Sequence, residues 1–141
     1  MRQQTTALAL LVAALVGCSS PSGVGMSNEP LVEVVEPNPG SAAQLTVRVS
    51  NRSGHPIAVS TCPGAGLRAE RRSGDGWEEA ALFRSGIACA ASIFELPPFG
   101  GPHVVSVPLL ADVVGGEYRV RVEVVTREGS RTGISNVFNL D

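Results

Sequence analysis

The stretch Tyr118-Arg119-Val120-Arg121-Val122-Glu123-Val124 alternates without a break between apolar and charged side chains. Successive side chains of a β-strand point to opposite faces, so a period of two predicts a strand with one buried and one solvated side. Half-buried strands of this kind are typical of antiparallel sheets that cover a core on one face only. The stretch therefore indicates a β protein.

Further strand signals lie on both sides of this stretch. Residues 45–50 alternate in the same way, and further stretches that favour strands occur at 31–36, 57–62, 67–72, 92–96, 103–107 and 134–140. Clusters of Gly, Pro and Asn separate the runs, as turns require. Residues 77–83 fit either the second arm of a hairpin or a short helix, and residues 127–133 are predicted as a loop. About seven to eight short strands at intervals of about 8–12 residues predict an all-β antiparallel sandwich over residues 31–141.

The composition agrees with this fold class and limits the core. Gly (16) and Pro (10) are frequent, which favours turns over long helices. Aromatic residues make up only 4% of the chain, so Val, Leu and Ile must fill most of the core. Trp77, Tyr118 and Phe138 are the large side chains expected inside.

The charges exclude several functions. The chain has 11 basic and 13 acidic residues, a net charge of −2, so we expect no nucleic-acid partner, because no broad positive field exists to bind phosphates. Every basic residue is Arg, and the lack of Lys excludes a Walker-type phosphate loop, a Schiff base and a Ser-Lys dyad. We also expect no cofactor.

The N-terminal segment is predicted to be a targeting signal. Arg2 precedes an apolar run over residues 7–17, which is too short for a membrane-spanning helix. This run ends in Leu15-Val16-Gly17-Cys18, which resembles the lipobox of bacterial lipoproteins. The resemblance implies that residues 1–17 are cleaved off as a signal peptide and that Cys18 carries lipid. Residues 18–30 are rich in Ser, Gly and Pro and are predicted to be a flexible tether.

The lipid implied by this resemblance predicts a location for the protein. Diacylglyceryl and N-acyl groups together exceed the two-signal threshold for stable anchoring, so the membrane is the first expected partner. Ser19 follows the lipidated Cys, where a retention signal would carry Asp. We therefore expect a cell-envelope protein, on the outer membrane of a cell with two membranes and on the outer face of the cytoplasmic membrane otherwise.

Two cysteines remain after lipidation, Cys62 and Cys89. Because the expected compartment is oxidising, a disulfide between them is the default prediction. We expect no metal site, since neither Cys lies in a C-x-x-C motif or at ligand spacing from a His.

The segment from Asp112 to Tyr118, with Gly116 two residues before the Tyr, resembles the tyrosine corner of immunoglobulin-like sandwiches. The blocks 45–53, 67–77, 116–119 and 135–138 resemble those of bacterial immunoglobulin-like domains in secreted and lipid-anchored proteins. The resemblance implies an immunoglobulin-like fold over residues 31–140 and a Tyr hydroxyl bonded to the crossing loop. Cys62, Trp77 and Cys89 depart from the antibody spacing, because Trp77 and Cys89 are too close in sequence, so antibody connectivity does not carry over.

We expect no catalytic residues. The only histidines are His55, in a Gly-His-Pro turn, and His103, at the start of a strand. No G-x-S-x-G motif places a serine for nucleophilic attack. A small hydrolase or metal carrier on a sandwich is the least favoured of the functions considered.

Two groups of residues are candidates for binding. Arg119, Arg121, Arg127 and Arg131 could bind an anionic glycan or the carboxylates of an envelope protein, although the solvated outer face of an antiparallel strand is the favoured explanation. Phe99, in a Pro/Gly-rich stretch, could stand exposed on a recognition loop, although a rigid connection with Phe99 folded onto the core is the favoured prediction.

These expectations together describe a membrane-anchored envelope lipoprotein with a non-enzymatic binding or structural domain. An inhibitor or accessory subunit that presents its loops to an envelope enzyme is the alternative.

Overall fold

The computed structural model describes residues 30–35, 44–84 and 93–141, and within these residues it contains ten strands and no helix. The strands are β1 (Leu31–Val35), β2 (Gln44–Ser50), β3 (Ile57–Ser60), β4 (Leu67–Ser73), β5 (Gly76–Ala80), β6 (Ile93–Leu96), β7 (His103–Pro108), β8 (Gly116–Thr126), β9 (Gly129–Ile134) and β10 (Phe138–Leu140).

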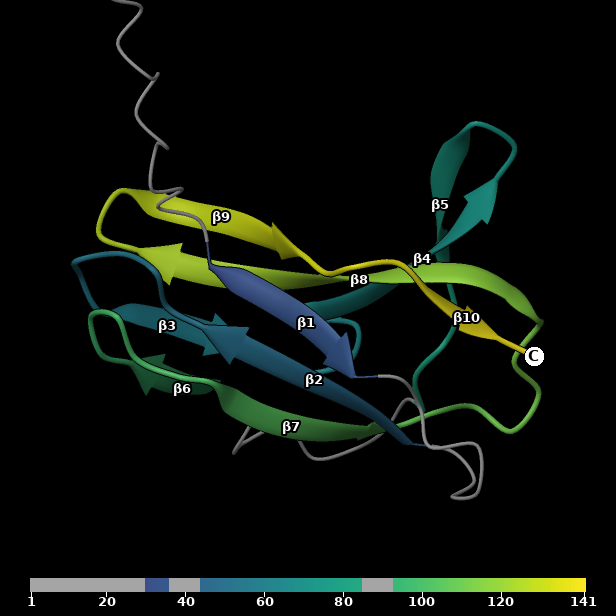
Figure 1. Cartoon of the computed structure of the whole chain (residues 1–141), viewed down its shortest axis with the longest axis horizontal. Helices are drawn as coiled ribbons and strands as arrows, with labels where there is room; N and C mark the ends of the chain where they lie inside the picture. Colours follow the sequence, from purple (N-terminus) through teal and green to yellow (C-terminus); the bar gives the residue numbers. More distant parts are fainter. Residues whose placement is uncertain (1–29, 36–43, 85–92) are drawn as a thin grey trace, which may run out of the picture.

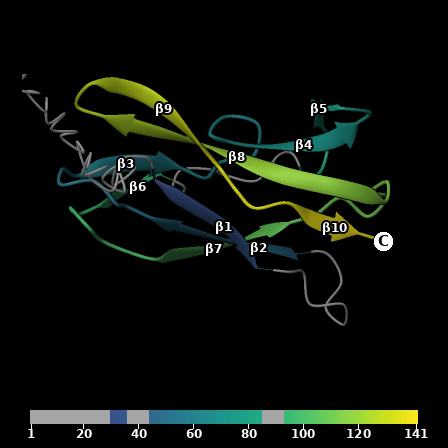
Figure 2. The ribbon, with the colours of Figure 1, turned by 45° about the horizontal axis from the view of Figure 1, so that its top comes forward.

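The strands form two antiparallel sheets packed against each other (Figures 1 and 2). One sheet has three strands in the order β1-β2-β7. The other has seven strands, and β8 is its central strand. β4 and β3 pair with one edge of β8, β10 and β9 pair with the other, and β5 and β6 extend the sheet outward. The predicted all-β sandwich is confirmed, with ten described strands where seven to eight were expected.

The alternation in β8 has the predicted consequence. Tyr118, Val120, Val122 and Val124 are at most 2% exposed and face the three-stranded sheet, while the charged residues between them face outward. Leu45, Val47 and Val49 of β2 are fully buried on the opposite layer. Burial of each such aliphatic side chain stabilises the fold by about 2 kcal/mol. The core is therefore a layer of Val and Leu between β2 and β8.

The tyrosine corner has its expected hydrogen bond. The Tyr118 hydroxyl donates to the carbonyl of Val114, which lies in the loop that leads into β8. Gly116 has a φ of 144°, a conformation that side-chain-bearing residues rarely adopt. The Tyr118 ring also stacks against Phe138 of β10, with 6.2 Å between the ring centroids. These contacts fix the entry of the central strand.

The β4–β5 connection is a hairpin, so the alternative helix over residues 77–83 is wrong. Ser73 pairs with Gly76, and Gly74 has a φ of 57° at the first central position of the turn, where a type II′ turn needs positive φ. Trp77 was expected in the core, but it lies on the solvent side of this hairpin. The guanidinium of Arg119 lies 4.5 Å from its ring centroid. Trp77 therefore covers charged groups rather than filling the core.

The C-terminal region corrects two further predictions. The predicted loop over residues 127–133 is a short turn at residues 127–128 followed by β9, which pairs with the end of β8. The predicted strand over residues 134–140 is interrupted after Ile134 and resumes as β10. β9 is an edge strand with mostly exposed side chains, so its sequence has no apolar alternation.

The two sheets meet where β1 lies beside β9 and the segment after it. The side chain of Asn136 accepts a hydrogen bond of 2.8 Å from the Val34 amide and donates one of 3.3 Å to the Val34 carbonyl. Nearby, a Cβ atom added to Gly133 would lie 2.6 Å from Cγ2 of Val32. Only a glycine permits this approach, and the contact closes one side of the sandwich.

Candidate functional site

One end of the sandwich gathers three chain connections: residues 51–56 between β2 and β3, residues 97–102 between β6 and β7, and residues 126–131, which contain the β8–β9 turn. Both views place these connections at the end seen on the left (Figures 1 and 2). We call residues 51–56, 97–102 and 126–131 the loop end. Since the loops come from both sheets, the loop end has a surface that neither sheet could form alone.

Asn51 links two of these loops from a buried position. It is 3% exposed, and its amide nitrogen donates to the carbonyls of His55 (2.7 Å), Pro97 (2.8 Å) and Leu96 (3.3 Å). Its amide oxygen accepts from the backbone amide (2.9 Å) and the hydroxyl (2.8 Å) of Ser53. One side chain thus satisfies polar groups of both loops, which would otherwise be buried without partners.

Backbone hydrogen bonds strengthen this link. The amide of Asn51 donates to the carbonyl of Gly100 at 2.8 Å, and the amide of Phe99 donates to the carbonyl of Ser53 at 3.1 Å. The 97–102 loop is therefore held against the 51–56 loop from both sides. Hydrogen bonds within the chain therefore fix its conformation.

Phe99 stands at the surface of this fixed loop. The residue is 68% exposed and has a φ of 55°, the left-handed region that is unfavourable for bulky residues. Its ring lies over Gly54, since a Cβ atom added there would be 3.7 Å from Cζ of Phe99. The loop thus holds an aromatic ring outward in a conformation that costs about 1–3 kcal/mol.

A cleft of about 270 Å³ adjoins Phe99 between the 51–56 loop and the β8–β9 turn. Its lining residues are Ser53, Gly54, His55, Ile57, Thr126, Arg127, Glu128 and Arg131. The Thr126 hydroxyl donates to the carbonyl of Gly129 and accepts from the amide of Glu128, which holds the turn. The cleft therefore combines the buried Ile57 with two arginines and one acidic residue, Glu128.

The solvent face of β4 and β8 contains a second charged cluster around Glu70. The Arg119 Nε lies 2.6 Å and the Arg121 Nη1 2.9 Å from the carboxylate of Glu70, which is only 8% exposed. Burial raises the pKa of Glu70, but hydrogen bonds and charge from the two arginines outweigh it, so the pKa is below its ordinary value. Both arginines are thus engaged within their own sheet.

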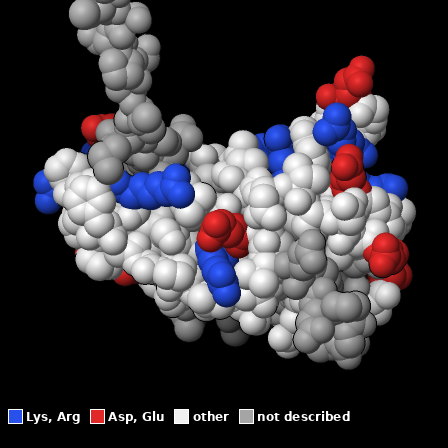
Figure 3. Space-filling view, viewed as in Figure 1, with Lys and Arg blue, Asp and Glu red and all other residues white. Residues whose placement is uncertain are grey.

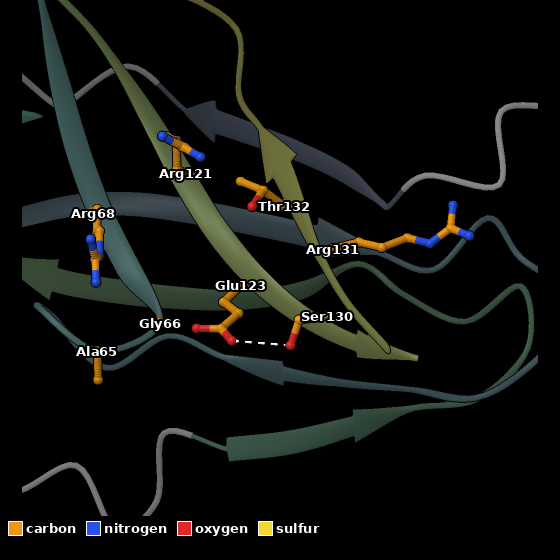
Figure 4. A pocket seen from close by; sticks show the side chains of 8 residues that line it. All are labelled: Ala65, Gly66, Arg68, Arg121, Glu123, Ser130, Arg131 and Thr132. Carbon is orange, nitrogen blue, oxygen red and sulfur yellow. Dashed lines mark hydrogen bonds between the residues drawn. The ribbon is translucent and has the colours of Figure 1, made fainter. Parts of the chain in front are cut away.

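A shallow cleft of about 250 Å³ lies beside this cluster on the outer face of the larger sheet (Figure 4). Arg68, Arg121 and Glu123 line it, and Ser130 donates a 3.2 Å hydrogen bond to Glu123. Arg131 belongs to the same lining but extends away from Glu123 (Figure 4). Because Arg68 pairs with Glu79 at 3.5 Å and Arg121 pairs with Glu70, the basic groups here already have acidic partners.

The structure divides the four arginines that were considered together. Arg119 and Arg121 lie on the Glu70 cluster, whereas Arg127 and Arg131 lie at the loop end. Arg131 pairs across the sheet with the inward-facing Val124 and lines the loop-end cleft, although it also reaches the lining of the cleft beside Arg121. This division was not predicted, because residues 127–133 were expected to be a loop and not to contain β9.

Sequence reasoning missed Asn51, although the segment Asn51-Arg52-Ser53 contains a usable signal. An Asn whose side chain accepts from the amide two residues later forms an Asx turn, which is common where strands end. The contacts to Leu96 and Pro97 had no such local signal.

The two histidines have different surroundings. His103 stacks on Phe94 with 3.7 Å between ring centroids and covers the edge between β6 and β7, while His55 lines the loop-end cleft. Across residues 30–35, 44–84 and 93–141, no group of three or more His, Cys, Asp or Glu residues gathers to hold a metal ion. No helix that could span a membrane occurs in this part of the chain either.

The predicted lipidation and disulfide lie partly beyond the structure. Cys18, the signal peptide and nearly all of the tether fall outside the described residues, as does Cys89. Cys62 is described, in the loop after β3, where its carbonyl accepts from the amide of Leu67 at 2.9 Å. Both features stay predictions.

No protein-family model, curated protein or solved structure matches this chain.

Proposed function

We propose that the protein is a lipid-anchored lipoprotein of the cell envelope, and that its immunoglobulin-like sandwich is a non-enzymatic binding domain with the loop end as its binding surface. The observation that carries the binding role is Phe99, an exposed aromatic residue in a left-handed conformation on a loop fixed by hydrogen bonds. Folding alone gives no reason to expose this ring. Strained, exposed residues on rigid loops concentrate at binding sites.

The anchor is supported by the lipobox-like Leu15-Val16-Gly17-Cys18 at the end of the apolar run. A tether over residues 18–30 would reach about 40 Å when extended, so the loop end could meet partners held in or near the same membrane. A disulfide between Cys62 and Cys89 belongs to the same proposal, because the envelope is an oxidising compartment.

The anchor is tested by replacing Cys18 with Ala. We expect C18A to leave the membrane fraction and to lose partitioning into detergent, because no acyl chain can then be attached. Ser19→Ala serves as the control and should stay on the membrane. Mass analysis of the unsubstituted protein should find a chain that begins at lipidated Cys18 and is lighter by the hydrogens lost on joining Cys62 to Cys89. Membrane retention of C18A would contradict the lipoprotein assignment.

The ordered loop end also supports a second candidate, an inhibitor or accessory subunit of an envelope enzyme. Such proteins present a preformed loop to a cleft, and the hydrogen bonds of Asn51 preform this one. The two candidates differ in the partner. If an envelope enzyme is isolated together with this protein, adding the purified protein should change the activity of that enzyme only if the protein is an inhibitor or accessory subunit.

A further inference from the structure

We propose that the loop end binds an acidic segment of a partner protein: Phe99 enters an apolar pocket of the partner, and the cleft beside it takes a carboxylate through Arg127 and Arg131. This inference deepens the proposed binding function, on which it rests, by naming the site and the class of partner.

The loop end has an excess of basic residues. The loop end contains Arg52, Arg127 and Arg131 against the single acidic residue Glu128, although the whole chain has a net charge of −2. In Figure 3, basic side chains are exposed at the left end of the molecule, where the β8–β9 turn lies in Figure 1. Complementary charge favours an acidic partner, both in the rate of encounter and in orientation.

Most polar groups in the cleft already have partners within the chain, and those that remain suit a carboxylate. The hydroxyls of Ser53 and Thr126 are engaged inside the loops, and Glu128 pairs with Arg131. Within the described residues, Arg127 forms no ion pair and no side-chain hydrogen bond. A neutral glycan needs free acceptors as well as donors, whereas the cleft offers mainly cationic donors. A guanidinium binds a carboxylate through paired hydrogen bonds, which these donors suit.

The loop end exposes an aromatic ring on a loop that is fixed before any partner binds. Aromatic residues and Arg dominate the energetics of protein interfaces, especially where an anchor side chain is fixed before binding. Phe99 is such an anchor, since the Asn51 and Ser53 hydrogen bonds hold its loop. A membrane surface would need no fixed loop geometry, so the rigidity of the loop favours a protein partner.

The experiment places the photo-crosslinker p-benzoylphenylalanine at position 99 of the full-length protein in its own cells. The probe resembles Phe in shape, so it suits the same backbone conformation. The matched control places it at Val114, which is 60% exposed against 68% for Phe99 but lies before the first residue of β8, whereas the β8–β9 turn follows the last. We expect a protein adduct from position 99 and none from position 114. Peptide mapping should locate the adduct in a segment rich in Asp and Glu.

A charge reversal tests the role of the cleft. Arg127→Glu should lower the yield of the adduct about tenfold, because it places a carboxylate against the acidic segment. Arg68→Glu makes the same change in net charge on the sheet face and should leave the yield unchanged. Arg127 lies in an exposed turn, so circular dichroism of R127E should match that of the unsubstituted protein.

Other outcomes overturn the inference in distinguishable ways. Adducts from position 114 but not from position 99 would refute this site while leaving a binding domain in place. Adducts with lipid or glycan at position 99, or yields insensitive to Arg127→Glu, would refute the acidic protein partner. An absence of adducts at both positions would refute the proposed binding function as well.

Discussion

At the scale of single residues, the left-handed backbone conformation of Phe99 destabilises the folded protein. A side chain at a φ of 55° is strained, and Gly is the residue that adopts this conformation without strain. At an ordinary loop position, Ala is more stable than Gly because Gly loses more backbone entropy on folding.

We predict the opposite order here: Phe99→Gly should be more stable than Phe99→Ala by about 1 kcal/mol. Urea denaturation followed by circular dichroism measures this difference between two variants that both lack the ring. As a control, the same Gly and Ala pair at Val114 should follow the ordinary order, since its φ is not positive. If Phe99→Ala proves the more stable variant, the left-handed conformation is wrong, and with it the argument that the loop presents the ring at a cost.

The contrast between Phe99 and Asn51 shows what a sequence reveals about a site. The Pro and Gly residues around Phe99 mark a loop from local sequence alone, so an exposed aromatic residue there could be considered in advance. Asn51 acts through carbonyls 45 and 46 residues away, a contact that exists only after the sheets have formed. The loop around Phe99 was therefore recognisable in the sequence, but the favoured prediction that its ring folds onto the core is wrong, and Asn51, which holds this loop, was not identified.

At the scale of strands, the predictions succeeded for β8 and β2, in which one face is buried, and failed for β9, in which neither face is. β8 and β2 alternate because one side of each contacts the core. β9 has a single buried residue, Gly133, and is a strand because its backbone pairs with β8. Edge strands of this kind have little side-chain signal, because tertiary pairing rather than side-chain burial specifies them.

β9 also provides a test of how the sheets join. Gly133→Ala should destabilise the protein by about 1–3 kcal/mol, because the new methyl group would lie 2.6 Å from Cγ2 of the buried Val32 and 3.2 Å from Cγ of Pro30. The midpoint of urea unfolding measures the loss. Gly76→Ala is the control, since its nearest contact would be 3.8 Å away and its φ is not positive.

A second substitution tests whether the loss of stability in Gly133→Ala comes from crowding against Val32. Val32→Ala removes the methyl group that the new side chain would meet, so the cost of Gly133→Ala should be smaller in the V32A background. Additive losses in the double variant would contradict the close packing of β1 against β9.

At the scale of the whole molecule, the Glu70 cluster links stability to pH. Glu70 lies under Arg119 and Arg121 at the centre of the larger sheet, and its pKa is lowered in the folded protein. In the unfolded chain the carboxylate returns to its ordinary pKa of about 4.3. The stability from this group is therefore fully present above that value and is lost as the pH falls through the lower pKa of the folded state.

We accordingly expect Glu70→Gln to be less stable than the unsubstituted protein by about 2 kcal/mol at pH 7, because the neutral amide loses both charged hydrogen bonds. The difference should shrink as the pH is lowered below about 4.3, where the carboxylate of the unsubstituted protein is also neutralised. Thermal unfolding between neutral and acidic pH measures the stability of both proteins.

Glu79→Gln is the matched control. Glu79 faces Glu70 across β4 and β5, but its side chain is 69% exposed and 3.5 Å from Arg68, so the loss of stability in this variant should be within about 0.5 kcal/mol. A difference for Glu70→Gln that stays constant down to strongly acidic pH would mean that shape, and not the charge of Glu70, accounts for its contribution.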